Sequence, residues 1–325
     1  MTAIRRPTRA RDHDALGPPR WRGQPGRLEV WYLTATDPAT GTGLWLHHEV
    51  VAPTDGGAPR PHGWIAVFPP DAEPRWARFA TPPGTGGGPD AVGERWFAGG
   101  DAILEPRRAA GSTDGATWDL EIHPSAEPPV WTFPAPVWDR ELLPAAQVLA
   151  GPSASISGTV EVDGFRIEMH DAPAGVARIY GQGNEKRWGW LHADLGGGDV
   201  LEVVSAVSTR PGLRLLPPAT MLQLRLGGHD VPRIPLAPGK VTLELPTWRF
   251  RAHFGRRRLR ATLPLPAERS ISVGYADPDG QTATCTNSER ASADIVLERL
   301  SGRRWTTERT WHLDGTAHSE VGLRP

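Results

Sequence analysis

The chain has very little cysteine, no long apolar run and almost no net charge. It has 325 residues and one cysteine, Cys285, so no intramolecular disulfide can form. With 36 basic and 37 acidic residues, no global field draws nucleic acid to the protein. No apolar stretch approaches the ~18 residues of a membrane helix, and the basic start MTAIRRPTRARDHD lacks the apolar region of a secretory signal. We therefore expect a cytoplasmic protein with no integral membrane segment and no nucleic-acid partner.

Tryptophan, glycine and proline are abundant instead. The chain has 14 Trp against 7 Phe and 3 Tyr, with 37 Gly and 34 Pro. Prolines interrupt almost every window long enough for a helix, while short runs of Val, Ile, Leu, Trp and Thr alternate with turn signals such as DPATG and DPDG. Runs such as RLEVWYLTAT, GLWLHHEVV and VTLELPTWRFRAHF predict strands. Their number predicts an all-β protein made of sandwiches or barrels.

One segment, DRELLPAAQVLAG at 139–151, predicts a short helix. Asp139 is a suitable N-cap and Gly151 a suitable end, although Pro144 limits the helix unless it lies in the first turn. We expect it to connect strands or to plug one barrel end, without a chemical role. A chain of 325 residues exceeds the usual size of one hydrophobic core, which favours two domains.

A weak internal repeat relates two of the predicted strands. GLWLHHEVV and GWLHADLGGGDVLEVV both contain Trp-Leu-His. Because side chains alternate between the two faces of a strand, the first strand places Trp45, His47 and Glu49 on one face. The second places Trp188, Trp190, His192 and Asp194 on one face in the same way. Each strand therefore presents an aromatic ring, an imidazole and a carboxylate in that order, as duplication of one β unit would produce.

A longer series of short motifs resembles a known superfamily. The series runs WYLT, GLWLHHEVVAP, HGWIAVFPP, ISGTVEVDGF, a glycine-rich loop into RWGWLHADL, LPTWRF and YADPDGQTATCTNSERASADIVLER. It is similar to the two-domain lipocalin-like superfamily of hydroxyneurosporene synthase (a carotenoid hydratase) and tocopherol cyclase-like proteins, from about residue 27 onward.

The resemblance implies two tandem lipocalin-like antiparallel β-barrel or calyx domains with one or two short helices. We expect a flexible segment at 1–26, a first domain at 27–180 and a second at 181–325, with a hydrophobic substrate within or between the domains. Such relatives protonate an isoprenoid olefin and trap the carbocation. In the hydratase branch the loop carries an Asp-His pair before Trp-Gly, whereas here Glu185 and Lys186 stand in its place.

The residues themselves define a candidate site. Protonating an alkene needs an acid kept neutral by burial, and tryptophan faces stabilise the resulting cation. The candidate catalytic residues are Glu185, His192, Asp194, His47 and Glu49, and the candidate ligand-binding residues are Trp45, Trp188, Trp190, Trp31 and Arg187. We expect no cofactor: the chemistry is that of a cyclase, hydratase or isomerase acting on a polyene or isoprenoid-like metabolite.

Several alternatives stay open. The same tryptophans would suit a non-catalytic lipocalin-like carrier of a hydrophobic ligand, or a pericyclase that only folds a polyene into shape. Glu185 could form a solvated ion pair with Lys186 and Arg187, which would hold its pKa down. His47, Glu49 and His192 could bind a metal, but with too few ligands for us to expect one. The basic run 249–262 indicates the exposed face and tip of a hairpin rather than a phosphate site, and Cys285 a structural thiol.

Overall fold

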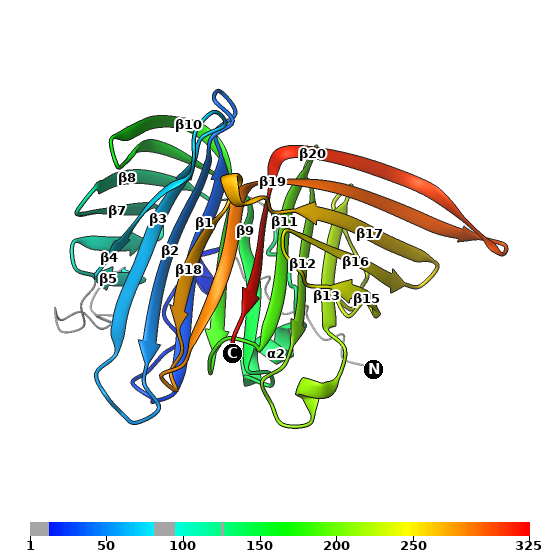
Figure 1. Cartoon of the computed structure of the whole chain (residues 1–325), viewed down its shortest axis with the longest axis horizontal. Helices are drawn as coiled ribbons and strands as arrows, with labels where there is room; N and C mark the ends of the chain where they lie inside the picture. The colour runs from blue at the N-terminus through cyan, green and yellow to red at the C-terminus, as the bar shows by residue number, and fades with distance from the viewer. Residues whose placement is uncertain (1–12, 81–94, 125–126) are drawn as a thin grey trace, which may run out of the picture.

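The protein is almost entirely β-structure, as the sequence predicts. The computed structural model describes residues 13–80, 95–124 and 127–325. Its strands form two ten-stranded antiparallel sheets, shown side by side in Figure 1. None of the helices in these ranges is long and apolar enough to cross a membrane.

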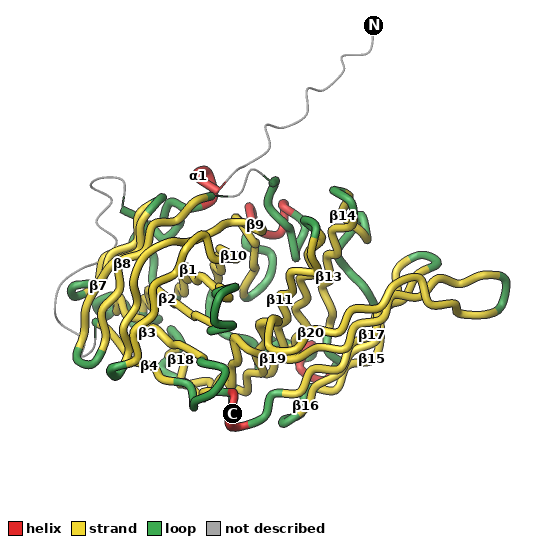
Figure 2. The backbone as a smooth tube through the Cα atoms, turned by 90° about the horizontal axis from the view of Figure 1, so that it is seen from above, coloured by secondary structure: helices red, strands yellow, loops and turns green. Residues whose placement is uncertain are grey.

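The first sheet has the order β4-β3-β2-β1-β10-β9-β8-β7-β6-β5. Its strands are β1 (Arg27–Thr36), β2 (Gly43–Ala52), β3 (Arg60–Phe68), β4 (Arg75–Phe79), β5 (Phe97–Gly99), β6 (Ala102–Glu105), β7 (Arg108–Thr113), β8 (Ala116–His123), β9 (Ala145–Val162) and β10 (Phe165–Gly181). The sheet curls until β5 contacts β3 and β4 contacts β7, so it forms a nearly closed barrel (Figure 2).

The second sheet has the order β14-β13-β12-β11-β20-β19-β17-β16-β15, with β18 paired to β19. Its strands are β11 (Arg187–Gly196), β12 (Asp199–Val207), β13 (Ala219–Leu226), β14 (His229–Val231), β15 (Gly239–Thr242), β16 (Thr247–Phe254), β17 (Arg257–Pro264), β18 (Ile271–Ala276), β19 (Thr282–Ser301) and β20 (Arg304–Leu323). The run predicted as one strand over 241–254 is divided at residues 243–246, where Pro246 cannot donate to the ladder. The second sheet also curls, because the bridge between Met221 and Leu236 joins the segment before β15 to β13, and we call the two sheets the first and second barrels.

The barrels meet along strands that are buried on both faces. All ten residues of β2 are buried. Leu44 and Leu46 point into the core of the first barrel, whereas Trp45 belongs to a cluster shared with Trp188 and Tyr275 of the second sheet. A strand can be buried on both faces only when a second layer covers it. Along β2, one set of alternate side chains therefore packs in the core of the first barrel, and the other set packs against the second barrel.

The two α-helices of the described residues share only Asp139 and Arg140 with the segment where the sequence predicts one. They are α1 (His13–Leu16) and α2 (Ala135–Arg140), and the residues from Ala145 onward form β9. The prediction of a helix over 139–151 is therefore wrong. Helix α2 ends at Glu141, which takes a left-handed conformation, and backbone pairing of 145–149 with 177–181 of β10 then fixes an extended chain. Two 3₁₀ turns, η1 (Leu213–Leu215) and η2 (Ala267–Arg269), complete the elements.

Of the segment expected to be flexible, 1–26, the structure describes residues 13–26. Residues 1–12 lie outside the described part of the chain, but Leu16 is buried in a cluster with Phe133 and Trp138. The buried Arg178 donates hydrogen bonds to the carbonyls of Leu16 and Gly17. Residues 13–17 are therefore packed onto the first barrel, because its core supplies a buried donor for their carbonyl groups.

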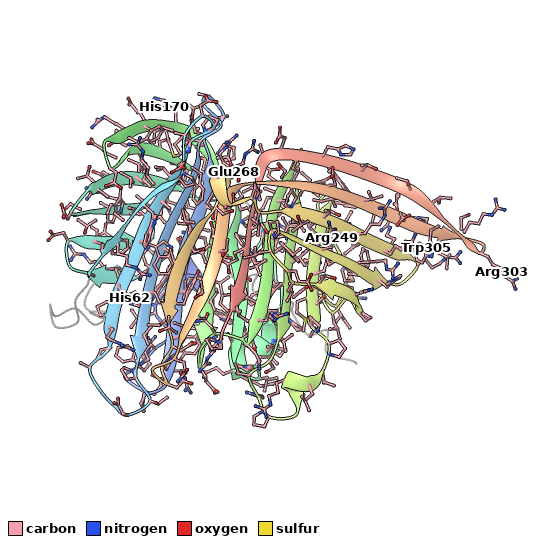
Figure 3. All side chains as sticks on the ribbon, viewed as in Figure 1. His62, His170, Arg249, Glu268, Arg303 and Trp305 are labelled. Atoms are coloured by element: carbon pink, nitrogen blue, oxygen red, sulfur yellow. The ribbon has the colours of Figure 1, made fainter. Side chains whose placement is uncertain are left out.

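The β19–β20 hairpin extends beyond the second barrel and ends near Arg303 and Trp305 (Figure 3). The Arg258 guanidinium lies 4.4 Å from the centre of the Trp305 ring, and Arg258 also forms an ion pair with Glu298 at 2.6 Å. Arg249 and Arg251 are exposed on β16, which pairs with β17 as a hairpin. The basic run thus covers an outer sheet face and a hairpin tip, as the sequence indicates.

His48 gives the first barrel a specific sensitivity to acid. Its ring is buried between Phe79 and Phe97, at 5.4 and 4.9 Å, and burial lowers the pKa of His48 from 6.5 to about 3. Protonation therefore favours the unfolded chain once the pH falls below about 6.5, and stability is lost progressively from there towards the folded pKa. We expect His48→Met to reduce the loss between pH 6.5 and about pH 5 by about 2 kcal/mol.

Urea unfolding at a series of pH values measures this difference. His170→Met is the control, because the His170 side chain is 78% exposed on the same barrel and its removal should leave the pH dependence unchanged. Equal acid sensitivity in the wild-type protein and His48→Met would show that the barrel core tolerates a charged imidazole.

Candidate active site

An apolar cavity of about 260 Å³ lies between the two barrels. Its walls come from β1, β2, β9 and β10 of the first barrel and from β11, β12, β13, β18 and β20 of the second. The polar or partly polar side chains among its lining residues are Tyr32, His47, Gln147, Asn184, Glu185, Ser208, Tyr275 and Glu320. Most of the other lining side chains are aliphatic or tryptophan, so the cavity suits a hydrophobic ligand with few polar atoms.

Aromatic rings form the wall between the barrels. Trp45, Trp188 and Trp190 line the cavity together with Tyr32 and Tyr275. Tyr32 of the first barrel packs edge-on to Trp190 of the second, with ring centres 5.4 Å apart. Tyr275 packs edge-on to Trp188 at 6.0 Å. Ring faces of this kind attract positive charge, so the wall could stabilise a cationic intermediate.

Gly322 allows Trp188 to take its position in the wall. The two residues pair across β11 and β20, and a methyl group on Gly322 would lie 2.0 Å from the Trp188 ring. We therefore expect Gly322→Ala to displace Trp188 and to lower the free energy of unfolding by about 1–3 kcal/mol. Gly274→Ala in β18 is the control, since its methyl group would meet Thr282 at 3.3 Å.

Thermal unfolding and retention of bound ligand in native mass spectrometry together test the role of Gly322. Both quantities should fall in Gly322→Ala and remain near the wild-type values in Gly274→Ala. Unchanged ligand retention in a destabilised Gly322→Ala protein would mean that Trp188 does not form part of the binding wall.

Glu320 and Glu185 are the carboxyl groups among the residues that line the cavity, and both are partly buried. Trp188 Nε1 donates to Glu320 Oε1 at 2.6 Å, and the Cys285 thiol donates to Glu320 Oε2 at 3.3 Å. Burial raises the pKa of Glu320, and these two hydrogen bonds only partly oppose that effect. A larger fraction of Glu320 is therefore the neutral acid than for a glutamate in water at the same pH, which is the state that a proton donor needs.

His47 and Glu49 form a second buried pair beside the cavity. His47 lines the cavity and stacks on Trp64, with ring centres 3.9 Å apart, and its Nε2 lies 3.1 Å from Glu49 Oε2. Burial lowers the pKa of His47 and raises the pKa of Glu49, so both groups favour their neutral forms. The pair is then an O–H to N hydrogen bond, which leaves the proton of His47 on Nδ1. Nδ1 is buried without a hydrogen-bond partner among the described residues.

Glu202 anchors a hydrogen-bond network behind the wall. Its Oε1 accepts from Trp190 Nε1 at 2.7 Å and from Gln147 Nε2 at 2.5 Å, while its Oε2 lies 2.9 Å from His192 Nδ1. Gln147 also donates to the Tyr32 hydroxyl at 2.6 Å. The network therefore fixes Trp190 and Tyr32, two facing members of the cavity wall, through one buried carboxylate.

Glu185 lies at the rim of the cavity. It accepts a hydrogen bond from the Thr209 backbone N–H at 3.2 Å, whereas its neighbours Lys186 and Arg187 are exposed. Burial raises the pKa of Glu185, in spite of the lowering effect of that hydrogen bond. The shift is opposite to the one expected of a solvated ion pair with Lys186 and Arg187.

The structure brings most of the sequence-predicted residues together, but not all of them. Trp45, His47, Trp188, Trp190 and Glu185 line the cavity, while Glu49 lies behind His47 and His192 stacks on Trp190. The remaining three do not reach the cavity: Asp194 is exposed and accepts from the Gly196 N–H, Trp31 points into the first barrel core and donates to the Gly17 carbonyl, and Arg187 is exposed.

Sequence reasoning missed Glu320 and Glu202. A signal for Glu320 is present, because His318 and Glu320 repeat the His-x-Glu spacing of His47 and Glu49. Residue 318 pairs with His192 and residue 320 with Trp190, which puts this third His-x-acid unit next to the second. Across the described ranges, no group of three or more His, Cys, Asp or Glu residues is arranged to hold a metal ion.

Comparison with known proteins identifies the family. The tocopherol cyclase-like family model matches residues 100–323, and the chain belongs to this family. An uncharacterized protein of Mycobacterium tuberculosis, from strains CDC 1551 / Oshkosh and ATCC 25618 / H37Rv, is 47% identical over 308 residues, which cover 94% of this chain and 89% of the relative.

Two solved structures share the two-barrel fold. CghA, solved with Sch210972, has a TM-score of 0.60 at 15% identity, covering 92% of this chain and 88% of its own. Kievitone hydratase from Nectria haematococca has a TM-score of 0.50 at 10% identity, covering 94% and 91%. At these identities the similarity establishes the fold.

Proposed function

We propose that this protein is an enzyme of the cyclase or hydratase type that acts on a hydrophobic polyene or isoprenoid-like metabolite by acid-initiated carbocation chemistry. The observation that carries the proposal is a partly buried carboxyl group with a raised pKa, Glu320, hydrogen-bonded to Trp188 in the wall of an apolar cavity lined by tryptophan. The family to which the chain belongs, and a hydratase with the same fold, support this class of reaction.

The first step would be transfer of the Glu320 proton to one carbon of a substrate double bond. The π electrons form the new C–H bond, the neighbouring carbon becomes the cation, and Glu320 is left as a carboxylate. The faces of Trp45, Trp188 and Trp190 would stabilise the cation until it is trapped. Trapping by a hydroxyl group of the substrate closes a ring, and trapping by water gives an alcohol; in each case the oxygen releases a proton, which restores the acid.

His47 and Glu185 would serve the trapping step. Glu49 holds Nε2 of His47, and Nδ1 has no hydrogen-bond partner among the described residues, but it is buried, so the His47 ring would have to shift to donate from Nδ1 to an oxygen atom of the ligand. Glu185 at the rim is the second acid that could exchange protons with water. Each of these groups must lie within hydrogen-bond distance of an oxygen atom of the substrate or of water. Such an arrangement would suit a substrate that carries an oxygen function at one end.

Two experiments separate the enzyme from a carrier. Native mass spectrometry followed by organic extraction identifies whatever the purified protein holds, and Trp190→Ala should reduce that retention in either case. Turnover of the recovered compound then distinguishes the two, because a carrier returns it unchanged. A protein that takes up no member of a panel of polyenes, isoprenoids and lipids would contradict both functions.

A further inference from the structure

Four exposed leucines surround the opening of the cavity, and we call them the mouth leucines: Leu142, Leu213, Leu215 and Leu216. Leu213 and Leu216 line the cavity and are nevertheless 45% and 56% exposed, so they mark its opening. Leu215 is 82% exposed and Leu142 is 50% exposed. Arg210 Nη1 donates to the Leu142 carbonyl at 3.5 Å, which ties the β12–β13 connection to the chain between α2 and β9. Figure 1 shows both segments at the same end of the molecule.

The chain around η1 holds these leucines outward. Gly212 precedes η1 with a positive φ of 85°, and Pro217 and Pro218 follow it directly. The Leu215 and Leu216 N–H groups donate to the carbonyls of Gly212 and Leu213, so the turn is closed by its own backbone. An apolar cluster displayed in this way, beside a binding cavity, marks a surface that a partner covers.

Cations flank the mouth leucines. Arg210 and Arg214 belong to the same connection, and Lys186 and Arg187 face it from the start of β11. Lys186, Arg187 and Arg214 line a shallow hollow next to Leu216, and Glu244 is the acidic side chain among its lining residues. The partner therefore needs an apolar interior and an anionic surface.

We propose that the mouth leucines and these cations dock on the surface of an anionic lipid bilayer, and that the hydrophobic substrate enters the cavity directly from the membrane. A bilayer matches both properties, because its headgroups attract arginine and lysine while its acyl region accepts leucine. A second copy of the chain matches less well: a two-fold interface places the same patch on both sides, so the cations would face one another. Only the nature of the cargo rests on the proposed function; docking itself does not.

Flotation with lipid vesicles tests docking without any assay of turnover. The wild-type protein should bind vesicles of phosphatidylcholine and phosphatidylglycerol in equal parts more tightly than vesicles of phosphatidylcholine alone. Leu142→Ser/Leu215→Ser should weaken binding by roughly tenfold or more, since each leucine withdrawn from the acyl region loses most of its transfer free energy. Neither residue lines the cavity, so ligand retention in native mass spectrometry should be unchanged.

Two controls match these variants. Leu142→Met/Leu215→Met changes the same positions but keeps them apolar, and it should bind vesicles like the wild-type protein. Arg214→Gln should weaken binding to the anionic vesicles by about fivefold. Arg303→Gln removes a charge from the distant hairpin tip, which is labelled in Figure 3, and should have no effect.

The possible results separate the two hypotheses. Vesicle binding that is absent in the wild-type protein, or equally strong in the serine variant, would overturn the docking proposal. A wild-type dimer in sedimentation velocity that the serine variant breaks, without vesicle binding, would assign the surface to a second copy and overturn it too. Docking with the expected losses but no turnover of any recovered ligand would leave docking in place and contradict only the enzymatic function.

Discussion

Glu320→Gln is expected to lower kcat for the recovered substrate by roughly 10²- to 10⁴-fold, the usual contribution of a positioned general acid. Glutamine keeps the size of the side chain and can still accept from Trp188 Nε1, but it has no acidic proton to transfer. Because the exchange keeps the shape of the side chain and the hydrogen bond from Trp188, it should leave the free energy of unfolding and ligand retention near their wild-type values. Turnover and ligand retention measured on the same preparation separate the two effects.

Asp194→Asn is the matched control, since it makes the same chemical change at an exposed carboxylate outside the cavity. The pH profile adds a second test. Burial raises the pKa of Glu320, and only its protonated form can act, so wild-type kcat should fall as the pH rises through that raised pKa. Residual turnover in Glu320→Gln should lack this decline. Full activity in Glu320→Gln would transfer the role to Glu185 or to the His47–Glu49 pair.

Arg178→Met is expected to cause the largest loss of stability, about 3–5 kcal/mol, because it leaves a buried carboxylate without its cation. Arg178 and Glu29 are each 1% exposed and form an ion pair, and the Arg178 guanidinium lies 4.3 Å from the centre of the Trp31 ring. Burial lowers the pKa of Arg178 to about 10, which still leaves it charged at neutral pH. Urea unfolding measures the change.

Arg258→Met is the comparison, because its ion pair with Glu298 lies near the surface and should contribute no more than about 1 kcal/mol. Adding Glu29→Gln to Arg178→Met should recover part of the loss, since the unpaired charge is then removed. A cost for Arg178→Met as small as that for Arg258→Met would mean that water reaches Glu29 when the guanidinium is absent.

The strands of the barrels follow closely from the sequence pattern. RLEVWYLTAT is β1 in full, because the run is rich in β-branched and aromatic residues and is bounded by turn residues on both sides. The error over 139–151 has a physical origin. Leu142, Leu143, Val148 and Leu149 satisfy a helical spacing as well as an extended one, and pairing with β10, more than 25 residues further along the chain, decides between them.

Sequence reasoning predicts those members of the candidate site that lie on the same strand as one another. Alternation places Trp45 and His47 on one face of β2, and Trp188 and Trp190 on one face of β11, and all four residues line the cavity. Asp194 continues the same pattern, but the pairing of β11 with β20 ends at Ala193 and its register with β12 shifts after Asp194, and the Asp194 side chain reaches solvent. Glu202 and Glu320 join the site through the pairing of β12 and β20 with β11; the His-x-Glu spacing marks Glu320 as a candidate, but it does not encode which strands pair.

The central claim is that a proton from the protein is added to a carbon atom of the substrate. Turnover of the recovered compound in D₂O, followed by mass spectrometry and NMR of the product, tests it most directly. Acid-initiated chemistry predicts one deuterium bound to carbon at the position that was protonated, with the label absent when the product is merely incubated with Glu320→Gln. A product formed at full rate without deuterium on carbon would contradict carbocation chemistry and favour a pericyclase that only folds its substrate.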